Sequence, residues 1–214
     1  MSEHSPAGRI VIDLFTTLDG VAQAPGGPEE DESGGFRFGG WQAPHPDDMA
    51  GRTIMDGIRS MDALLLGRRT YDIFAGYWPE QDVEIGRIFD ALPKYVASRD
   101  AGLEPSWSGT TRIGDSLAAE IRDLRSRHRE THVIGSIDLV QTLLADRLWG
   151  SSPEDELRLW VYPIVLGSGR RVFPDGAAPA NLRLIEPPLS GSAGAVLLRY
   201  ASLPGIPETG TMDA

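Results

Sequence analysis

Cysteine is absent from this 214-residue sequence, and Lys94 is the only lysine among its 20 basic residues. Without cysteine the chain can form neither disulfides nor thiolate nucleophiles nor cysteine-ligated metal sites. The four histidines lack the spacing of a metal site, so we expect no bound metal. No apolar run approaches the roughly 20 residues that a membrane-spanning helix requires, so we expect no membrane segment.

Acidic residues outnumber basic ones, and the formal net charge is −11. Such a protein repels nucleic acids and anionic membrane surfaces, so we expect neither as a partner. Residues 1–8 lack the basic start and apolar core of a signal peptide, which favours a cytoplasmic protein. The hydrophobic content of 41% suffices for the core of one sizeable domain. We predict a single domain over residues 9–201, with flexible termini at 1–8 and 202–214.

The order of apolar strands and amphipathic helices predicts an α/β fold. Strands and helices alternate through the first part of the chain, which indicates right-handed crossovers and a parallel sheet. Strands dominate the end of the chain and are expected to add antiparallel partners at one edge. The predicted strands cover 9–20, 63–67, 94–100, 110–113, 131–135, 156–167, 182–187 and 195–201. The predicted helices cover 48–61, 82–92, 115–129 and 137–148, and another begins near Tyr71.

A long loop rich in glycine, proline and acidic residues separates the first strand from the first helix. It covers residues 21–48 and contains Phe36, Phe38 and Trp41. Loops of this length are uncommon inside compact domains and are usually functional or disordered. The three aromatic side chains argue against disorder, because they need a surface on which to pack. The acidic run PEEDE at 28–32 is expected to be a solvated part of this loop.

Three predicted strands end in residues suited to binding an anion. These residues are Gly67, Arg68, Arg69 and Thr70, then Ser98 and Arg99, and then Gly135 and Ser136. The carboxyl ends of parallel strands meet at one edge of a sheet, where helix N-termini and arginines bind phosphates. Three such ends indicate a long, multiply charged ligand such as a dinucleotide. The alternative is that each is an ordinary turn with a solvated arginine.

The segments FTTLDGVA, LLLGRRTYDIF, KYVASR, HVIGSIDLVQTLL and DELRLWVYPIVLGSGRRVF follow one another along the chain. In this combination the sequence resembles the dihydrofolate reductase-like superfamily. The closer likeness is to the reductase domain of bacterial riboflavin-biosynthesis deaminase-reductases, in its stand-alone form, over residues 9–201. The resemblance implies a three-layer fold with a mixed, mostly parallel central sheet, an antiparallel C-terminal edge and helices on both faces.

The resemblance also implies NADPH as the cofactor, bound along the three strand ends. In the family the G-R-x-T turn touches the cofactor phosphates, and the Ser-Arg pair lies near the adenosine 2′-phosphate. A Gly-Gly turn cradles the pyrophosphate; here it reads Gly135-Ser136, and the backbone N–H of Ser136 can still donate. The loop after the first strand covers the nicotinamide. The implied cofactor-binding residues are Gly67, Arg68, Arg69, Thr70, Ser98, Arg99, Gly135, Ser136, Ile137 and Leu139, with Thr17, Asp19, Gly20 and Val21 at the nicotinamide.

The resemblance implies less about the substrate. Folate reductases carry an acidic residue at the start of the helix after the first loop, where it supports pterin protonation. Asp47 and Asp48 hold the comparable place here and are the candidate catalytic residues. The alternative is that Asp48 only caps the helix, a role that aspartate favours. Phe36, Phe38 and Trp41 are candidate walls of the substrate site.

These observations predict an NADPH-dependent reductase of a small heterocycle, resembling the 5-amino-6-(5-phosphoribosylamino)uracil reductase of riboflavin biosynthesis or dihydrofolate reductase. A phosphorylated substrate needs a second basic patch, and the long loop offers only Arg37, with Arg52 just beyond it. The alternative from another class is a non-catalytic nucleotide-binding or sensor protein on the same fold. The apolar C-terminal strands leave an edge that needs covering, and the family often pairs there, so we expect a homodimer.

Overall fold

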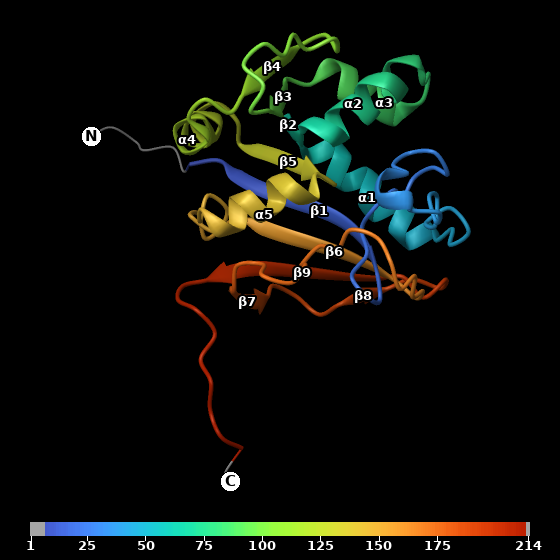
Figure 1. The fold of residues 1–214 in the computed structure, drawn as a ribbon, viewed down its shortest axis with the longest axis vertical. Coiled ribbons are helices and arrows are strands. Elements are labelled where there is room, and N and C mark those ends of the chain that lie inside the picture. Colours follow the sequence, from blue (N-terminus) through green and yellow to red (C-terminus); the bar gives the residue numbers. More distant parts are fainter. Residues whose placement is uncertain (1–6, 213–214) are drawn as a thin grey trace.

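Within residues 7–212, which the computed structural model describes, nine strands form one sheet at the middle of the protein (Figure 1). The outermost parts of the predicted flexible termini, 1–6 and 213–214, lie outside the described residues. The strands are β1 (Arg9–Thr17), β2 (Ala63–Gly67), β3 (Lys94–Ala97), β4 (Thr110–Ile113), β5 (Glu130–Ile134), β6 (Glu156–Tyr162), β7 (Asn181–Leu184), β8 (Leu189–Ser190) and β9 (Val196–Leu203). The α-helices are α1 (Asp48–Ser60), α2 (Arg68–Tyr77), α3 (Glu84–Ala91), α4 (Leu117–Arg127) and α5 (Ile137–Ala145). No helix of this part of the chain has both the length and the apolar character needed to cross a membrane.

The sheet changes direction near its C-terminal edge. Its order is β4-β3-β2-β5-β1-β6-β9-β7, and β8 pairs with β9. The strands from β4 to β6 in this order are parallel, whereas β9 pairs antiparallel with β6, β7 and β8. This arrangement confirms the predicted mixed sheet with an antiparallel C-terminal edge. Because β1, β2, β3 and β5 are parallel, their carboxyl ends lie along one edge of the sheet.

The elements follow the predicted order, with shifts at their ends. β6 ends at Tyr162 rather than at 167, because Pro163 has no backbone N–H for a further ladder bond. β9 continues to Leu203, two residues into the predicted C-terminal tail. Gly8 of the predicted N-terminal tail donates its N–H to the carbonyl oxygen of Arg125 at 2.8 Å. Gly8 and the last two residues of β9 thus take part in the fold although they lie outside residues 9–201.

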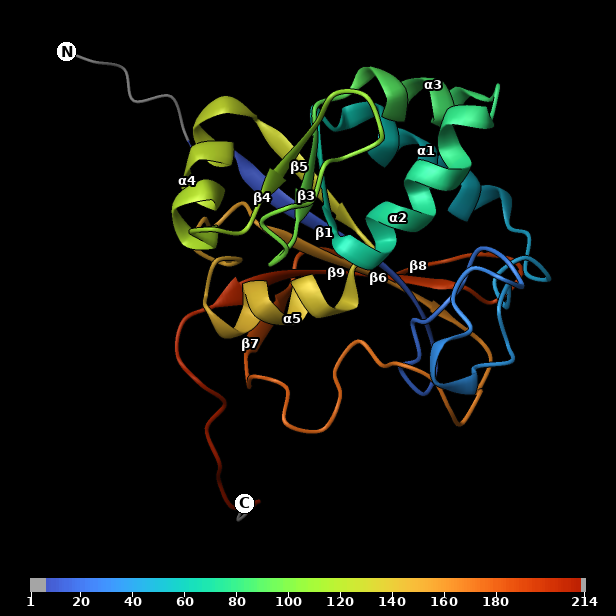
Figure 2. The same ribbon diagram turned by 45° about the horizontal axis from the view of Figure 1, so that its top comes forward.

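Apolar side chains on both faces of the sheet produce the three layers. On β1 the alternate residues Ile10, Ile12 and Leu14 are buried against side chains of α4 and α5. On the other face, α1, α2 and α3 pack on β2 and β3. Figures 1 and 2 show α4 and α5 separated from the other three helices by the sheet. The intervening residues Asp13 and Phe15 of β1 line a cavity together with α1.

The loop at 21–48, called the lid loop below, has an ordered interior. The buried Gln23 side chain donates to two backbone carbonyls of the loop, at 3.1 and 2.9 Å. Its Oε1 accepts a hydrogen bond from Arg170 N at 3.0 Å. Trp41 Nε1 donates to the Gln23 carbonyl oxygen at 2.8 Å. Gln23 therefore fixes the lid loop against itself and against the segment that follows β6.

Candidate active site

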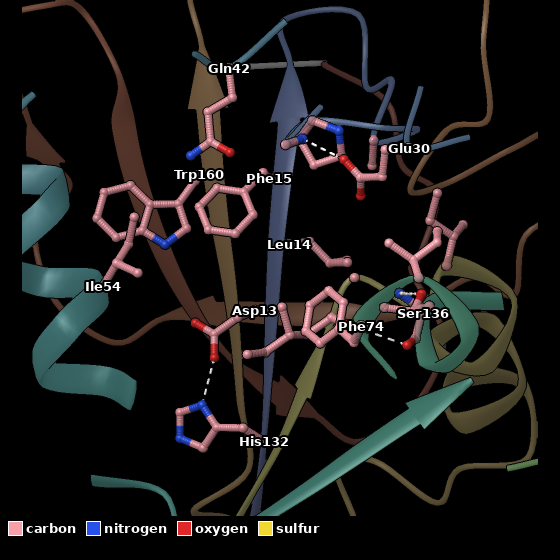
Figure 3. A pocket seen from close by; sticks show the side chains of 18 of the residues that line it. Asp13, Leu14, Phe15, Glu30, Gln42, Ile54, Phe74, His132, Ser136 and Trp160 are labelled. Carbon is pink, nitrogen blue, oxygen red and sulfur yellow. Dashed lines mark hydrogen bonds and ion pairs between the residues drawn. The ribbon is translucent and has the colours of Figure 1, made fainter. Parts of the chain in front are cut away.

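A cavity of about 320 Å³ lies between the sheet, α1, α2 and the lid loop (Figure 3). Asp13 from β1, His132 from β5 and Arg158 from β6 contribute charged side chains to its lining. Thr70 and Ser136, where α2 and α5 begin, line it as well. The cavity therefore connects the predicted cofactor edge with the face of β1 that α1 covers.

Apolar and aromatic side chains form most of the cavity wall. The rings of Phe15 and Trp160, paired across β1 and β6, are nearly parallel, with centroids 6.4 Å apart and an interplanar angle of 17°. Ile54 of α1 and Phe74 of α2 complete this part of the wall (Figure 3). Walls of this kind suit a flat ring system, because aromatic rings favour stacked and edge-to-face packing.

Charged side chains from the middle of the central strands form one end of the cavity. His132 Nδ1 lies 2.7 Å from Asp13 Oδ2, and His132 Nε2 lies 2.7 Å from Glu130 Oε1. Arg158 is opposite Asp13 in the strand register, with its Nη1 3.7 Å from Asp13 Oδ1. The Asp13 side chain is 15% exposed and that of His132 is 1% exposed. Asp13 is therefore the more accessible partner of a buried ion pair.

The surroundings of His132 require a proton on each ring nitrogen. Each nitrogen faces a carboxylate oxygen, and an ionised carboxylate can only accept hydrogen bonds. Burial disfavours the charged ring, but the hydrogen bonds and charge of Asp13, with the hydrogen bond of Glu130, outweigh burial and the opposing charge of Arg158. The pKa of His132 is therefore raised. The two carboxylates thus favour the charged form of His132 directly beside the cavity.

Glu130 links this pair to the rest of the sheet. Its Oε2 accepts hydrogen bonds from Arg9, at 2.9 Å from Nε and 2.6 Å from Nη2, and its Oε1 accepts one from Ser60 Oγ at 2.7 Å. Burial alone raises the pKa of Glu130, but the hydrogen bonds from His132, Ser60 and Arg9 lower it to about 2. Glu130 therefore stays ionised and holds His132 in its charged form.

The predicted cofactor edge is the place where α2 and α5 begin beside each other. Among the described residues no side chain caps either helix N-terminus, so the first-turn amides lack partners of that kind. A Cβ added at Gly67 would meet the Leu139 Cβ at 3.4 Å, an ordinary van der Waals contact, so α2 and α5 pack closely at this point. Gly135 has a φ of 59°, a conformation that favours glycine. The two helix N-termini thus lie beside each other and create an anion-binding edge.

Ser136 makes contacts that differ from the expectation. Its backbone N–H, expected to be available to a cofactor, donates to Thr70 Oγ1 at 3.0 Å. Its hydroxyl accepts a hydrogen bond from Gly67 N at 2.9 Å and donates to the Ile134 carbonyl oxygen at 3.1 Å. Ser136 and Thr70 therefore tie α5 to α2. Ile137, which follows Ser136, lines the cavity.

The three predicted phosphate-binding arginines have different surroundings. Arg68 Nε donates to Asp72 Oδ2 at 2.8 Å on the exposed side of α2. Arg69 Nη1 lies 3.3 Å from Asp31 Oδ2 in the lid loop. Arg99 is exposed and forms no ion pair with any residue of the described range 7–212. Of the three, Arg99 alone can reach a ligand without giving up such a pair.

The residues predicted at the nicotinamide form a tight turn after β1. Thr17 Oγ1 donates to Asp19 Oδ1 at 2.6 Å and accepts from Val21 N at 3.0 Å, and Gly20 has a φ of 81°. Asp19 Oδ2 accepts from Gly167 N at 2.8 Å. Burial opposes the ionisation of Asp19, but these hydrogen bonds outweigh it and the pKa of Asp19 is lowered. This turn joins the start of the lid loop to the segment after β6. The four predicted residues are not among the described residues that line the cavity.

Two arginines hold Asp31 of the lid loop against the cofactor edge. Arg170 Nη2 lies 2.6 Å from Asp31 Oδ2, and Arg69 approaches the same carboxylate. Burial opposes its ionisation, but hydrogen bonds from Ser33 and the arginine charges lower the pKa of Asp31. The expectation of a solvated acidic run is wrong for this residue, whose side chain is 8% exposed. Arg170 Nε is buried with no hydrogen-bond partner among the described residues, so this arginine keeps an unused donor.

The candidate catalytic residues Asp47 and Asp48 lie outside the lining found for the cavity in residues 7–212. Asp47 Oδ1 accepts a hydrogen bond from Ala50 N at 2.9 Å, so Asp47, and not Asp48, caps α1. Asp47 Oδ2 accepts another from Ala193 N at 2.9 Å, and the two bonds lower the pKa of Asp47. Asp48 is exposed in the first turn of the helix.

The aromatic residues of the lid loop pack away from this cavity. Trp41 is buried against Tyr162, with ring centroids 5.5 Å apart. Phe36 is buried and packs edge-on against Phe38, which is 41% exposed. The lining found in the described residues includes none of the three predicted substrate walls. The cavity is lined instead by Phe15 of β1, Trp160 of β6, Phe74 of α2, Phe89 of α3 and Trp78, directly after α2.

Asp13, His132 and Arg158 escape sequence inspection, although a signal for them exists. Each is a charged or titratable residue inside an apolar strand, within VIDLF, THVI and LRLW. Such residues are rarely buried without a partner. Their grouping depends on β5 and β6 both lying next to β1, which is a property of the topology.

Comparisons with known proteins agree with this fold. The family model of the RibD C-terminal domain matches residues 9–187. The uncharacterized protein YyaP of Bacillus subtilis (strain 168) is 26% identical over 206 residues, which cover 94% of this chain and 98% of YyaP. A solved structure from Shewanella sp. PV-4, described as a candidate riboflavin biosynthesis protein, is 19% identical with a TM-score of 0.70, over 92% of this chain and 99% of that one. Dihydrofolate reductase from Enterococcus faecalis, solved with NADP(H), is 11% identical with a TM-score of 0.55, over 92% of this chain and 98% of that one. The last two likenesses concern the fold, and they confirm the predicted dihydrofolate reductase-like architecture.

Proposed function

The chain belongs to the RibD C-terminal domain family, and from this premise we propose that it is an NADPH-dependent reductase of a small heterocyclic compound. The observation that carries the proposal is the continuity of the cavity. Its lining includes Arg69, Thr70 and Ser136 at the cofactor edge as well as Phe15 and Trp160 beside the ion pair. Reduction by a nicotinamide requires that the cofactor and the substrate touch each other and that water is kept out. One continuous, largely apolar cavity meets both requirements.

The residues at the cofactor edge fit a dinucleotide. The uncapped starts of α2 and α5 would hold the pyrophosphate, because helix N-termini favour anions. Arg99 would pair with the additional phosphate of NADPH, and Arg170 keeps a buried Nε donor without a partner in the described residues. When bound, NADPH supplies a hydride. The protein's own contribution is to hold the two reactants together and to provide a proton.

The charges of the cavity favour a substrate without a phosphate group. Arg69 and Arg170 are paired with Asp31, and Arg158 lies beside carboxylates of β1 and β6. The lining found in the described residues offers no further arginine or lysine. A ribose phosphate such as that of the riboflavin intermediate would meet no unpaired cation there. A compact uncharged ring, such as a pteridine or a pyrimidine, matches the aromatic walls better.

The test is the oxidation of NADPH in the presence of a panel of pteridines and pyrimidines, with and without a ribose phosphate. We expect turnover with at least one unphosphorylated member of the panel. A mass-spectrometric search for a ligand that co-purifies with the protein narrows the panel. Tight NADPH binding without oxidation of any compound would instead favour the non-catalytic nucleotide-binding protein.

We also propose that the protein forms a two-fold homodimer through its antiparallel edge. The exposed apolar residues Leu184, Leu189 and Leu203 lie on the C-terminal strands, and Ile185 follows β7. Such an edge invites pairing unless it is covered. Light scattering at micromolar concentration should show twice the chain mass. A species of 23.2 kDa would refute the dimer.

A further inference from the structure

The reductase function leaves one chemical requirement without an assigned group. Reduction of a C=N bond by hydride forms a new C–H bond, and the nitrogen needs a proton to complete its N–H bond. Asp47 and Asp48 lie outside the described lining of the cavity. Among its acidic lining residues, Asp31 is held by two arginines, which leaves Asp13 and Glu30 as candidate donors.

We propose that Asp13 and His132 act as one proton-donating pair, in which Asp13 hands a proton to a ring nitrogen of the substrate. The proposal rests on the proposed reductase function and specifies its acid. Asp13 is the catalytic residue because it is the accessible member of the pair. Glu130 is a positioning residue, since it binds the far side of the imidazole ring.

The pair holds a proton because of its geometry. Both nitrogens of His132 lie 2.7 Å from carboxylate oxygens, so both carry hydrogen in the resting state. One of these hydrogens already lies between His132 Nδ1 and Asp13 Oδ2, beside the cavity (Figure 3). The supply of a proton therefore needs only a short shift towards Asp13.

The transfer balances in atoms and charge. The hydride accounts for two electrons and one hydrogen, and it becomes the new C–H bond. The Nδ1 proton of His132 passes to Asp13, and Asp13 releases a proton to the substrate nitrogen, which forms the N–H bond. His132 becomes neutral and keeps the hydrogen on Nε2, which remains hydrogen-bonded to Glu130. Its bare Nδ1 then faces an ionised carboxylate, which favours uptake of a proton from solvent once the product has left.

The charged groups around His132 come from three strands. Asp13 on β1 and Glu130 on β5 favour the charged ring, and Arg158 on β6 opposes it. Arg9 acts indirectly, because it binds the second oxygen of Glu130. Ser60, at the end of α1, donates a neutral hydrogen bond to Glu130. Around the imidazole ring, two carboxylates favour the protonated form and one arginine disfavours it. The carboxylates prevail, as the raised pKa of His132 also indicates.

Glu30 is the rival acid and supplies the competing variant. It lies in the lid loop and also lines the cavity, where burial raises its pKa. Its Oε2, however, accepts hydrogen bonds from the backbone N–H groups of Gly26 and Gly27, at 2.6 and 3.1 Å. These donors favour the ionised form but do not offset burial, since the pKa of Glu30 is still raised. Within residues 7–212 no imidazole is bonded to Glu30 to restore a proton after transfer. Glu30→Gln is therefore expected to lose less of kcat than Asp13→Asn.

The first experiment measures the proton without any substrate. Nitrogen-15 NMR of histidine-labelled protein reports whether each ring nitrogen carries hydrogen. We expect His132 to be doubly protonated at pH 7.5, a pH at which an ordinary histidine of pKa 6.5 is mostly neutral. Asp13→Asn should lower the pH at which the ring loses its proton. A wild-type His132 with one bare nitrogen at pH 7.5 overturns the proposal.

The second experiment measures the use of the proton. NADPH oxidation is followed with dihydropterin and with every other panel compound that the wild-type protein reduces. Asp13→Asn should lower kcat by about 100-fold or more, the usual contribution of a general acid, with a smaller change in KM. The wild-type kcat should decline as pH rises and His132 loses its proton, and His132→Gln should abolish this decline. Because removal of a buried charge can impair folding, each variant is first checked by its melting temperature, and the isosteric Asp13→Asn carries the test if His132→Gln does not fold.

The outcomes separate the proton donor from the function. Suppose that the wild type turns over a compound of the panel. The assignment is then overturned if Asp13→Asn keeps the wild-type rate, or if Glu30→Gln loses at least as much of kcat as Asp13→Asn, while the reductase function stands. NADPH binding without turnover of any compound removes the reductase function, and the catalytic role of the pair with it. A larger loss of kcat in Asp13→Asn than in Glu30→Gln supports the pair.

Discussion

Replacement of Arg99 by alanine is expected to weaken the binding of NADPH and to leave NADH binding nearly unchanged. Arg99 follows β3 near the start of α2, next to the buried Ser98, and no ion pair within residues 7–212 involves it. NADPH differs from NADH by one phosphate, which carries about two negative charges near neutral pH. A charge-assisted hydrogen bond to it contributes about 1.5–3 kcal/mol. The dissociation constant for NADPH should therefore rise by roughly 10- to 150-fold.

Isothermal titration calorimetry with both cofactors checks this selectivity. Arg68→Ala is the matched control, because its guanidinium is held by Asp72 on the exposed side of α2. Arg69→Ala should show a smaller asymmetry, since this arginine is shared with Asp31. The stability of Arg99→Ala should stay within about 0.5 kcal/mol of the wild type, as for other exposed substitutions. Equal losses for both cofactors would assign Arg99 to the pyrophosphate or to the fold, and no loss for either would place the additional phosphate elsewhere.

Three further predictions concern Asp48, the buried pair of Asp155 and Arg125, and the charged groups around His132. Asp48→Asn should keep both turnover and melting temperature, because Asp48 is exposed outside the cavity lining; a large loss of kcat would restore it as the acid. Asp155→Ala should destabilise the fold by about 3–5 kcal/mol, because it leaves Arg125 buried without the carboxylate that it binds at 2.7 Å through both Nη atoms. In thermal melts this corresponds to a loss of roughly 6–20 °C, and a shift of a degree or two would contradict it. The lowered pKa of Glu130 contributes stability that is complete above its ordinary value of 4.5 and is lost as pH falls towards 2. The raised pKa of His132 contributes stability that is complete below its ordinary value of 6.5 and is lost as pH rises through the raised value. The free energy of unfolding, measured in urea at a series of pH values, should therefore fall both towards acid and towards alkaline pH. A free energy that does not change with pH would refute the charged arrangement of Glu130 and His132.

The order and type of the elements could be predicted because they depend on local patterns. Ile10, Ile12 and Leu14 alternate along β1 as a strand requires, and Ile121 and Leu124 recur at helical spacing in α4. The ends of elements were less predictable. Pro163 terminates β6 by local chemistry, but β9 reaches Leu203 only because β7 pairs with it there.

The cofactor edge was partly predictable for a similar reason. A glycine and a polar residue at a strand end mark a turn into a helix, and parallel strands bring such turns to one edge. The partners of those residues depend on the tertiary structure. Ser136 N–H donates to Thr70, and Arg69 binds Asp31, because residues distant in the sequence meet at this edge.

The sequence by itself determined the α/β alternation, the antiparallel end of the sheet and the strand ends where a dinucleotide is expected, because periodicity and turn residues act over a few neighbouring positions. It also offered two acidic residues at the start of the first helix, Asp47 and Asp48, without a physical means of choosing between them. The tertiary structure decided that Asp47 caps α1, that Asp31 is held by two arginines, and that Asp13 and His132 share a hydrogen bond beside the cavity. The reason is that burial and charge pairing are properties of three-dimensional neighbours. Asp13 and His132 are 119 positions apart in the chain, and only the placement of β5 beside β1 brings their side chains within 2.7 Å.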